Sequence, residues 1–119
     1  MSLNKVMLIG NVGQDPRVRY VDKDRPVATF SLATSDPAYT LPNGTQVAER
    51  TEWHNIVTWG NLAKFIEQHV RKGQKLFIEG SIHTRQYEDK SGIRRNITEI
   101  WVDKIEKFSV IQSQPQAES

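Results

Sequence analysis

Hydrophobic and polar positions alternate with a period of two through most of this chain, the pattern of β-strands. Residues 5–9 are mostly apolar and predict a strand buried on both faces. Residues 17–21 alternate and predict a continuation of that strand beyond a bend. Residues 27–34 predict the next strand, with Phe30 and Leu32 on one face.

The second half of the chain carries longer alternating segments. The last of them is apolar on both faces, with Trp101 and Ile105 on the same one. A long loop at residues 36–48 contains Asn43-Gly44, a pair that favours a hairpin tip, so we expect a β-ribbon there. The predicted strands are residues 51–59, 75–87 and 94–107, with a hairpin turn at residues 88–92.

One segment has the period of a helix instead. We expect Asn61 to be its N-cap. Arg71 and Lys72 are expected in its last turn, and Gly73 at the left-handed position that ends it. The apolar stripe of this helix is Leu62, Phe65, Ile66 and Val70.

The order of elements defines the expected fold. Three strands, one helix and two strands fit an all-β chain, a five-stranded oligonucleotide-binding (OB) barrel with one helix between strands 3 and 4. The alternative is an open α+β sheet. We expect residues 1–108 to form this domain and residues 109–119 to form a short polar, disordered tail.

The composition limits the class of protein but does not identify a binding partner. The chain has 119 residues, which suits a single domain, and a formal net charge of only +2. It has no cysteine, which excludes disulfides, thiol catalysis and Cys-based zinc sites. No apolar run is long enough to span a bilayer, and the first residues do not resemble a signal peptide. We therefore expect a cytoplasmic protein.

Catalytic motifs are missing from the sequence. The three histidines, His54, His69 and His83, form no metal-binding pair, and neither a GxSxG elbow nor a GxxxxGK[ST] loop occurs. The glycines of the Gly10–Gly13 segment are better explained as a barrel corner that needs small residues. We expect neither an enzyme nor a bound metal or cofactor.

Aromatic and basic residues gather on predicted strand faces. Trp53 and Trp59 share one face of their strand, where rings are either core or a surface that something covers. Flat rings interleaved with cations suit single-stranded nucleic acid, because rings stack on bases while Arg and Lys neutralise phosphates. The candidate residues from these strands are Trp53, Asn55, Trp59, His83, Arg85 and Tyr87.

Several short motifs follow one another in a specific order. Together they resemble bacterial single-stranded DNA-binding proteins from residue 4 to about residue 108, although none would do so alone. The motifs are Asn4-Lys5-Val6, Gly10 to Pro16, Val18-Arg19-Tyr20, Leu32 to Ser35, Thr51 to His54, Arg71 to Gly80 and Thr84 to Tyr87.

This resemblance implies a homotetramer that wraps single-stranded DNA with little sequence preference. It implies base stacking on Trp53, Trp59 and Tyr87, with Tyr39 as the nearest match to a fourth ring. Asn55 and His83 stand at positions that are often Arg in the family. His54 matches a residue at the subunit interface. The residues implied to contact the DNA backbone or lie beside it are Arg19, Lys72 and Arg85.

The implied role is to protect exposed strands during DNA replication, repair and recombination, at the nucleoid. Full-length bacterial members usually end in an acidic tip that recruits replication and repair proteins. This sequence ends in Gln116-Ala117-Glu118-Ser119, so we do not expect that recruitment. Two alternatives stay open: a dimeric accessory protein of replication restart, and a small nuclease or hydrolase that uses scattered carboxylates.

Overall fold

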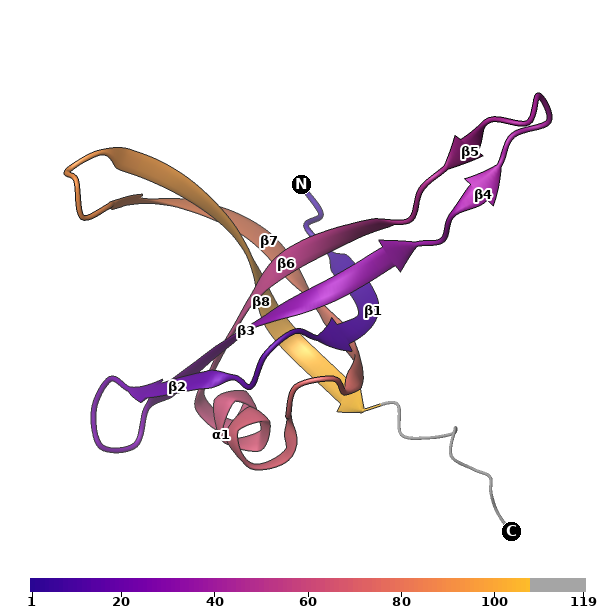
Figure 1. The fold of residues 1–119 in the computed structure, drawn as a ribbon. Helices are drawn as coiled ribbons and strands as arrows, with labels where there is room; N and C mark the ends of the chain where they lie inside the picture. Colours follow the sequence, from indigo (N-terminus) through magenta and orange to yellow (C-terminus); the bar gives the residue numbers. More distant parts are fainter. Residues whose placement is uncertain (108–119) are drawn as a thin grey trace, which may run out of the picture.

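A computed structural model describes residues 1–107 and shows a small barrel with two long projecting arms (Figure 1). The predicted tail at residues 109–119 lies outside the described residues. The elements are β1 (Val6–Val12), β2 (Arg17–Tyr20), β3 (Pro26–Asp36), β4 (Tyr39–Thr40), β5 (Gln46–Val47), β6 (Arg50–Trp59), α1 (Gly60–His69), β7 (Lys75–Glu88) and β8 (Arg94–Lys107).

Five strands close into a ring, in the order β1-β7-β8-β6-β3 and back to β1. All neighbours in this ring are antiparallel except β6 and β8, which pair in parallel. The predicted OB barrel, with its helix between the third and fourth long strands of the barrel, is confirmed.

Strand β2 continues β1 along the same partner, as the sequence predicted. Val12 pairs with Leu32 of β3 and Arg17 pairs with Thr29, so five steps along one strand match three along the other. Two extra residues therefore bulge out between β1 and β2, and they turn the chain at the barrel corner. Gly10 lies directly under the backbone carbonyl of Ala33, which leaves no room for a Cβ.

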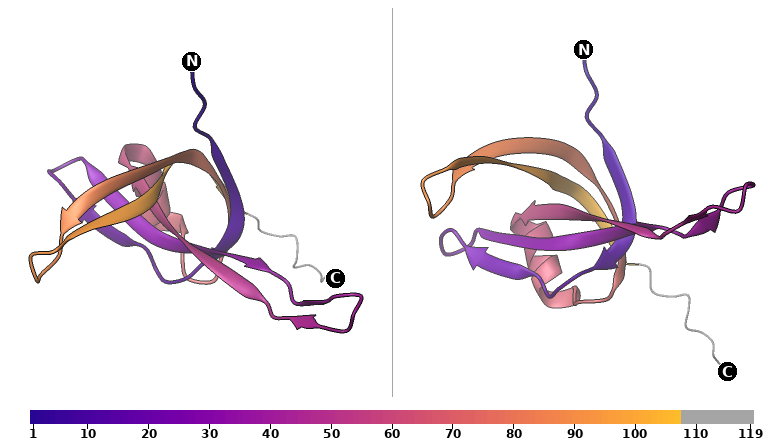
Figure 2. Two further views of the ribbon diagram at one scale, coloured as in Figure 1. Left: turned by 90° about the horizontal axis from the view of Figure 1, so that it is seen from above. Right: turned by 45° about the horizontal axis from the view of Figure 1, so that its top comes forward.

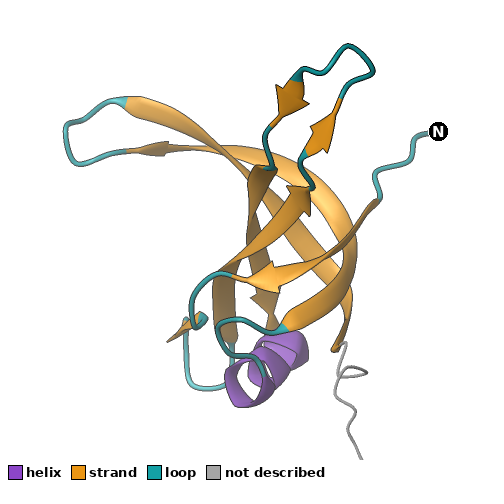
Figure 3. Cartoon of the chain, turned by 45° about the vertical axis from the view of Figure 1, so that its right-hand side comes forward, coloured by secondary structure: helices purple, strands orange, loops and turns teal. Residues whose placement is uncertain are grey.

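The barrel core is apolar and is closed at one end by the helix (Figure 3). Ala63, Ile66 and Val70 are fully buried against strands β3 and β6. No helix among residues 1–107 is long and apolar enough to cross a membrane.

The helix ends differ from the prediction. Trp59 is the N-cap residue and makes no side-chain capping bond, so Asn61 lies inside the first turn. The helix stops at His69, before Arg71, whose guanidinium nevertheless donates hydrogen bonds to the carbonyls of Glu67 and Val70. Gly73 is left-handed, as expected, but it belongs to the next turn rather than to the helix end.

Two further predictions about strand faces are wrong. Strand β1 is not buried on both faces, because Met7 and Ile9 are 61% and 49% exposed. In β8, Asp103 is an extra residue opposite the step from Glu79 to Gly80. This bulge reverses the alternation, so Ile105 packs against the core and does not share a face with Trp101.

Both arms are hairpins with the same kind of tip (Figure 2). Strands β4 and β5 form the predicted ribbon, and β7 and β8 extend past the barrel into a second hairpin. In each tip a glycine, Gly44 or Gly92, has a positive φ and donates its N–H to the carbonyl three residues earlier. At the second tip, Asp89 accepts hydrogen bonds from the backbone and from Arg95.

Candidate nucleic-acid interface

The outer face of the sheet opposite the core carries the aromatic and polar residues that the sequence singled out. Paired residues of adjacent strands point to the same side. The register therefore places Trp53 beside Ala33, Asn55 beside Ser31 and Trp59 beside Val27 on this face. Arg19 pairs with Val27 and extends the same row.

Trp53 lies exposed on this face and packs over a glycine. Its side chain is 58% exposed. A Cβ added to Gly13 would lie 2.5 Å from Cζ3 of the indole, so the ring rests directly on the Gly13 backbone. The small residues of the barrel corner thus have a second use, because they leave space for an exposed ring.

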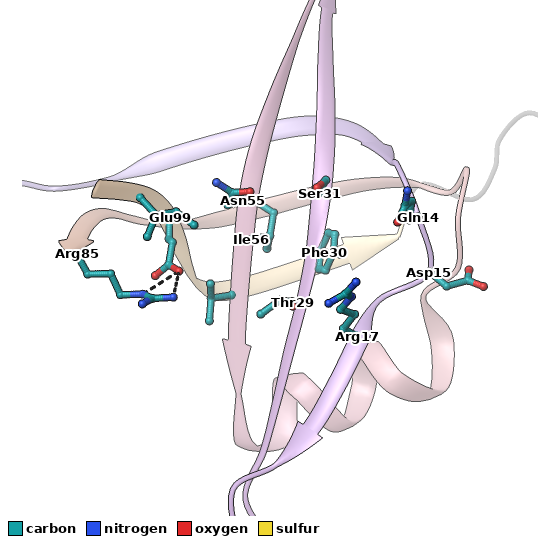
Figure 4. Close-up of a pocket in the computed structure, with 12 residues that line it drawn as sticks. Gln14, Asp15, Arg17, Thr29, Phe30, Ser31, Asn55, Ile56, Arg85 and Glu99 are labelled. Carbon is teal, nitrogen blue, oxygen red and sulfur yellow. Dashed lines mark hydrogen bonds and ion pairs between the residues drawn. The ribbon is translucent and has the colours of Figure 1, made fainter. Parts of the chain in front are cut away.

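A groove of about 320 Å³ runs over this face beyond Trp53 (Figure 4). Its floor includes Ser31 and Asn55, and the amide of Asn55 donates to the backbone carbonyl of Thr98 at 3.2 Å. Arg17 and Arg85 line it as well. The groove is open and mixed in polarity, which suits a flexible strand better than a compact small molecule.

Trp59 belongs to an aromatic cluster that the sequence pattern did not predict. It meets Trp101 edge-on, with ring centroids 5.1 Å apart. Trp101 in turn stacks on His83, with centroids 3.7 Å apart and planes 15° from parallel. Trp59 remains 45% exposed. The useful signal was the parity of Trp101 with Glu99, since a carboxylate on that face argues against a core face.

Glu99 binds two side chains of this face, Arg85 and Trp101. Its Oε2 accepts a hydrogen bond from Nε of Arg85 at 3.1 Å and lies 3.1 Å from Nη2 of the same guanidinium in an ion pair. Its Oε1 accepts a hydrogen bond from Nε1 of Trp101 at 3.1 Å. His83 is fixed separately, with its Nε2 2.8 Å from Oγ of Ser81. The predicted cation Arg85 therefore lies on the candidate interface, where it is already paired with Glu99.

Three further cations lie near the groove, and two of them, Arg19 and Lys72, were predicted from the sequence. Within residues 1–107, Arg17, Arg19 and Lys72 form no ion pair. The backbone N–H of Lys72 donates to Asp15, a groove residue, at 2.8 Å. This bond anchors the turn that carries Lys72 beside one end of the groove.

The two tyrosines that the sequence predicted, Tyr39 and Tyr87, lie on the arms rather than at the groove. Tyr87, 41% exposed, is near the tip of the β7–β8 arm and pairs with Arg95 across the hairpin. Tyr39 is on the β4–β5 ribbon opposite Val47. The structure therefore places Trp53, Trp59, Asn55 and Arg85 on one face of the sheet and places the two predicted tyrosines on the arms.

His54 points away from this face, as its parity predicted. Its Nε2 lies 2.9 Å from Oγ1 of Thr34, and it lines a shallow depression of about 360 Å³ beside Ile82. Ile82 is exposed. Within residues 1–107, no cluster of His, Asp and Glu side chains could hold a metal ion.

The fold and this face define an OB barrel with a surface suited to nucleic acid. Comparisons with known proteins identify the family. The model of the single-strand binding protein family matches residues 3–108, so the chain belongs to that family. Its members bind single-stranded DNA and are not enzymes, which agrees with the sequence prediction.

Two relatives define the similarity further. The chain is 62% identical over 109 residues to a single-stranded DNA-binding protein of Bacteroides thetaiotaomicron, a match covering 92% of this chain and 68% of that protein. The fold of the present chain matches that of a Plasmodium falciparum SSB in complex with single-stranded DNA, with a TM-score of 0.80 and 35% sequence identity. That match covers 92% of this chain and 97% of the other.

Proposed function

We propose that this chain binds single-stranded DNA as a homotetramer without sequence preference. It protects exposed strands during DNA replication, repair and recombination, in the cytoplasm at the nucleoid. The observation that carries the binding proposal is the row of exposed rings, Trp53 and Trp59, on either side of an open groove. Family membership supports the same activity.

Base stacking supplies much of the affinity in this proposal. Each base stacked on an aromatic side chain contributes about 1–3 kcal/mol by alanine substitution. A strand that crosses the groove from Trp53 to Trp59 passes over Asn55 and lies near Arg17 and Arg19. Because every base has a π-face, this arrangement needs no particular sequence.

The arms extend the proposed path beyond the barrel. Tyr87 and Tyr39 each place an exposed ring on a hairpin that projects from the sheet. Lys72 supplies a cation at the other end of the groove, where Asp15 holds its turn. The proposed DNA-binding residues are thus Arg19, Tyr39, Trp53, Asn55, Trp59, Lys72, His83, Arg85 and Tyr87.

Strand β1 supports self-association. Its first residues pair with β7 on one edge only, since pairing with β3 is confined to Asn11 and Val12. An open strand edge beside the exposed side chains of Met7 and Ile9 is a surface that proteins normally cover. A second copy of the chain, paired along β1, would cover both.

His54 supports a contact in a depression that borders the proposed DNA face, since Trp53 and Asn55 also line it. The depression that it lines includes Ile82, an exposed apolar residue. Polar and apolar groups that lie together in a shallow hollow suit a protein contact better than DNA, whose phosphates need cations. We therefore propose that His54 lies in a subunit interface of the tetramer.

Labelled oligo(dT) and a duplex of equal length test this function directly. Fluorescence anisotropy at low salt should rise with the single strand and much less with the duplex, and light scattering should give the mass of a tetramer. Equal binding to the duplex would contradict the proposed specificity. Incubation of the labelled strand with Mg²⁺ tests the nuclease alternative, and we expect it to remain intact.

A further inference from the structure

A carboxylate is buried in the middle of the face proposed to bind phosphates. Glu99 is only 5% exposed and pairs with His83 on one side and Asn55 on the other. A negative charge here opposes a polyanion unless something neutralises it. Other interactions of Glu99 must therefore outweigh this repulsion.

The contacts of Glu99 show what it does. Nε of Arg85 donates to Oε2, Nη2 forms an ion pair with the same oxygen, and the indole N–H of Trp101 donates to Oε1 (Figure 4 shows the Arg85 pair). Charge-assisted hydrogen bonds of this kind orient both partners. Trp101 is thereby held where it stacks on His83 and supports the edge of Trp59.

The same contacts change the charge that DNA meets. The positive charge of Arg85 is opposed at hydrogen-bond distance, so this part of the face carries little net charge. Arg17 and Arg19, which form no ion pair within residues 1–107, lie across the sheet, on β2. Base stacking and the release of counterions from the phosphates would thus occur at different places along the bound DNA strand.

We propose that Glu99 is a positioning residue for single-stranded DNA binding, which fixes Arg85 and Trp101 and cancels the charge of Arg85. The inference rests on the proposed function. Arg85 then acts as a fixed hydrogen-bond donor rather than as a free cation.

The salt dependence of oligo(dT) binding tests the charge part. For single strands, the slope of log K against log salt changes by about 0.7 for each phosphate neutralised. The Glu99→Gln variant releases Arg85 as a free cation, so its slope should steepen by about 0.7. The Arg85→Gln/Glu99→Gln double variant replaces a neutral pair by a neutral pair and should keep the wild-type slope. An unchanged slope in the single variant, or a slope shallower by about 0.7 in the double variant, would overturn the proposal.

Asp22→Asn is the matched control. It frees Arg25 from an exposed ion pair of the same length, 3.1 Å, in the turn after β2, and neither residue lines the groove. The slope of log K against log salt for this variant should equal that of the wild type. If it steepens as much as in Glu99→Gln, the effect comes from the overall charge of the protein and not from Arg85. If the wild type itself does not bind oligo(dT), the proposed function fails; if it binds normally while the slopes disagree, only this inference fails.

Indole hydrogen exchange tests the positioning part. Gln keeps an oxygen that can accept from Trp101 Nε1, whereas Leu does not. The Trp101 indole N–H resonance should stay protected in Glu99→Gln and exchange faster in Glu99→Leu, with the Trp53 resonance as an internal reference. Equal protection of Trp101 in both variants would show that Glu99 does not hold it.

Discussion

Trp101 stacks on His83 with ring centroids 3.7 Å apart and planes 15° from parallel. The same indole meets Trp59 edge-on. A ring that is itself half-buried therefore joins one side chain from β7 to another from β6. Contact with Trp101 therefore restricts the movement of Trp59 beside the proposed DNA path.

Replacement of Trp101 by Val should destabilise the protein by about 1–3 kcal/mol, because two aromatic pairs are lost and each is worth about 0.5–1.5 kcal/mol. Denaturant unfolding measures this, and oligo(dT) affinity should fall as well because Trp59 loses its support. Trp101→Phe keeps a ring and should lose less of both. Wild-type stability in Trp101→Val would show that these contacts contribute nothing.

Gly13 should matter for binding and hardly for folding. In Gly13→Ala the new Cβ meets the ring of Trp53, and this exposed ring can move aside at little cost. We expect stability close to wild type and oligo(dT) binding weaker by up to about tenfold, since one stack is misplaced. Gly10→Ala is the contrast, because its Cβ meets the backbone of Ala33 and should cost about 1–3 kcal/mol of stability. Unchanged oligo(dT) affinity in Gly13→Ala would show that the position of Trp53 does not matter for DNA binding.

Removal of either exposed indole should weaken binding through lost stacking. Trp53→Ala and Trp59→Ala should each cost about 1–3 kcal/mol in oligo(dT) affinity. The corresponding Phe variants retain a ring and should bind nearly as well as wild type. Isothermal titration measures both sets. Full affinity in both Ala variants would remove these rings from the interface.

Substitution of His54 should act on assembly first. His54→Tyr loses the contact with Thr34 and places a bulkier ring in the proposed interface. Sedimentation at low micromolar protein should show smaller species, with DNA binding reduced only as a consequence. His69→Tyr, on the exposed side of α1, is the control and should remain assembled. An intact tetramer in His54→Tyr would place His54 outside the interface.

Acid should loosen the tip of the β7–β8 arm. The Arg95 hydrogen bond, and then the N–H of Ile93, lower the pKa of Asp89 from its ordinary value of 3.8. A lowered folded-state pKa gives stability that is present above 3.8 and is lost as the pH falls through the folded value. An NMR titration of the Asp89 carboxyl should have its midpoint below 3.8, and Arg95→Gln should raise it. A midpoint at or above 3.8 in the wild type would contradict the ion pair.

Strand alternation was enough to place Trp53, Asn55 and Trp59 on one face, because that face depends only on the local period of β6. The Asn43-Gly44 pair likewise predicted the ribbon from local turn chemistry. The direction in which the ribbon projects, and hence the separation of Tyr39 from the groove, depends on the barrel and has no local signal.

Trp101 illustrates what alternation could not supply. Its partners Trp59 and His83 lie on two other strands, so the cluster depends on the long-range register of β8 with both β6 and β7. The bulge at Asp103 also breaks the parity that tied Trp101 to Ile105. The ion pair that neutralises Arg85 was hidden for the same reason, because Glu99 becomes its neighbour only when β7 and β8 pair.

The intrinsic tryptophan fluorescence of the wild-type protein, titrated with oligo(dT) of graded length, tests the central claim most directly. Stacking of bases on Trp53 and Trp59 should quench the emission to saturation at low salt, and added salt should reverse the quenching steeply. The length at which quenching saturates gives the number of nucleotides that one assembly occupies. Emission that oligo(dT) of any length leaves unchanged at low salt would contradict binding on this face.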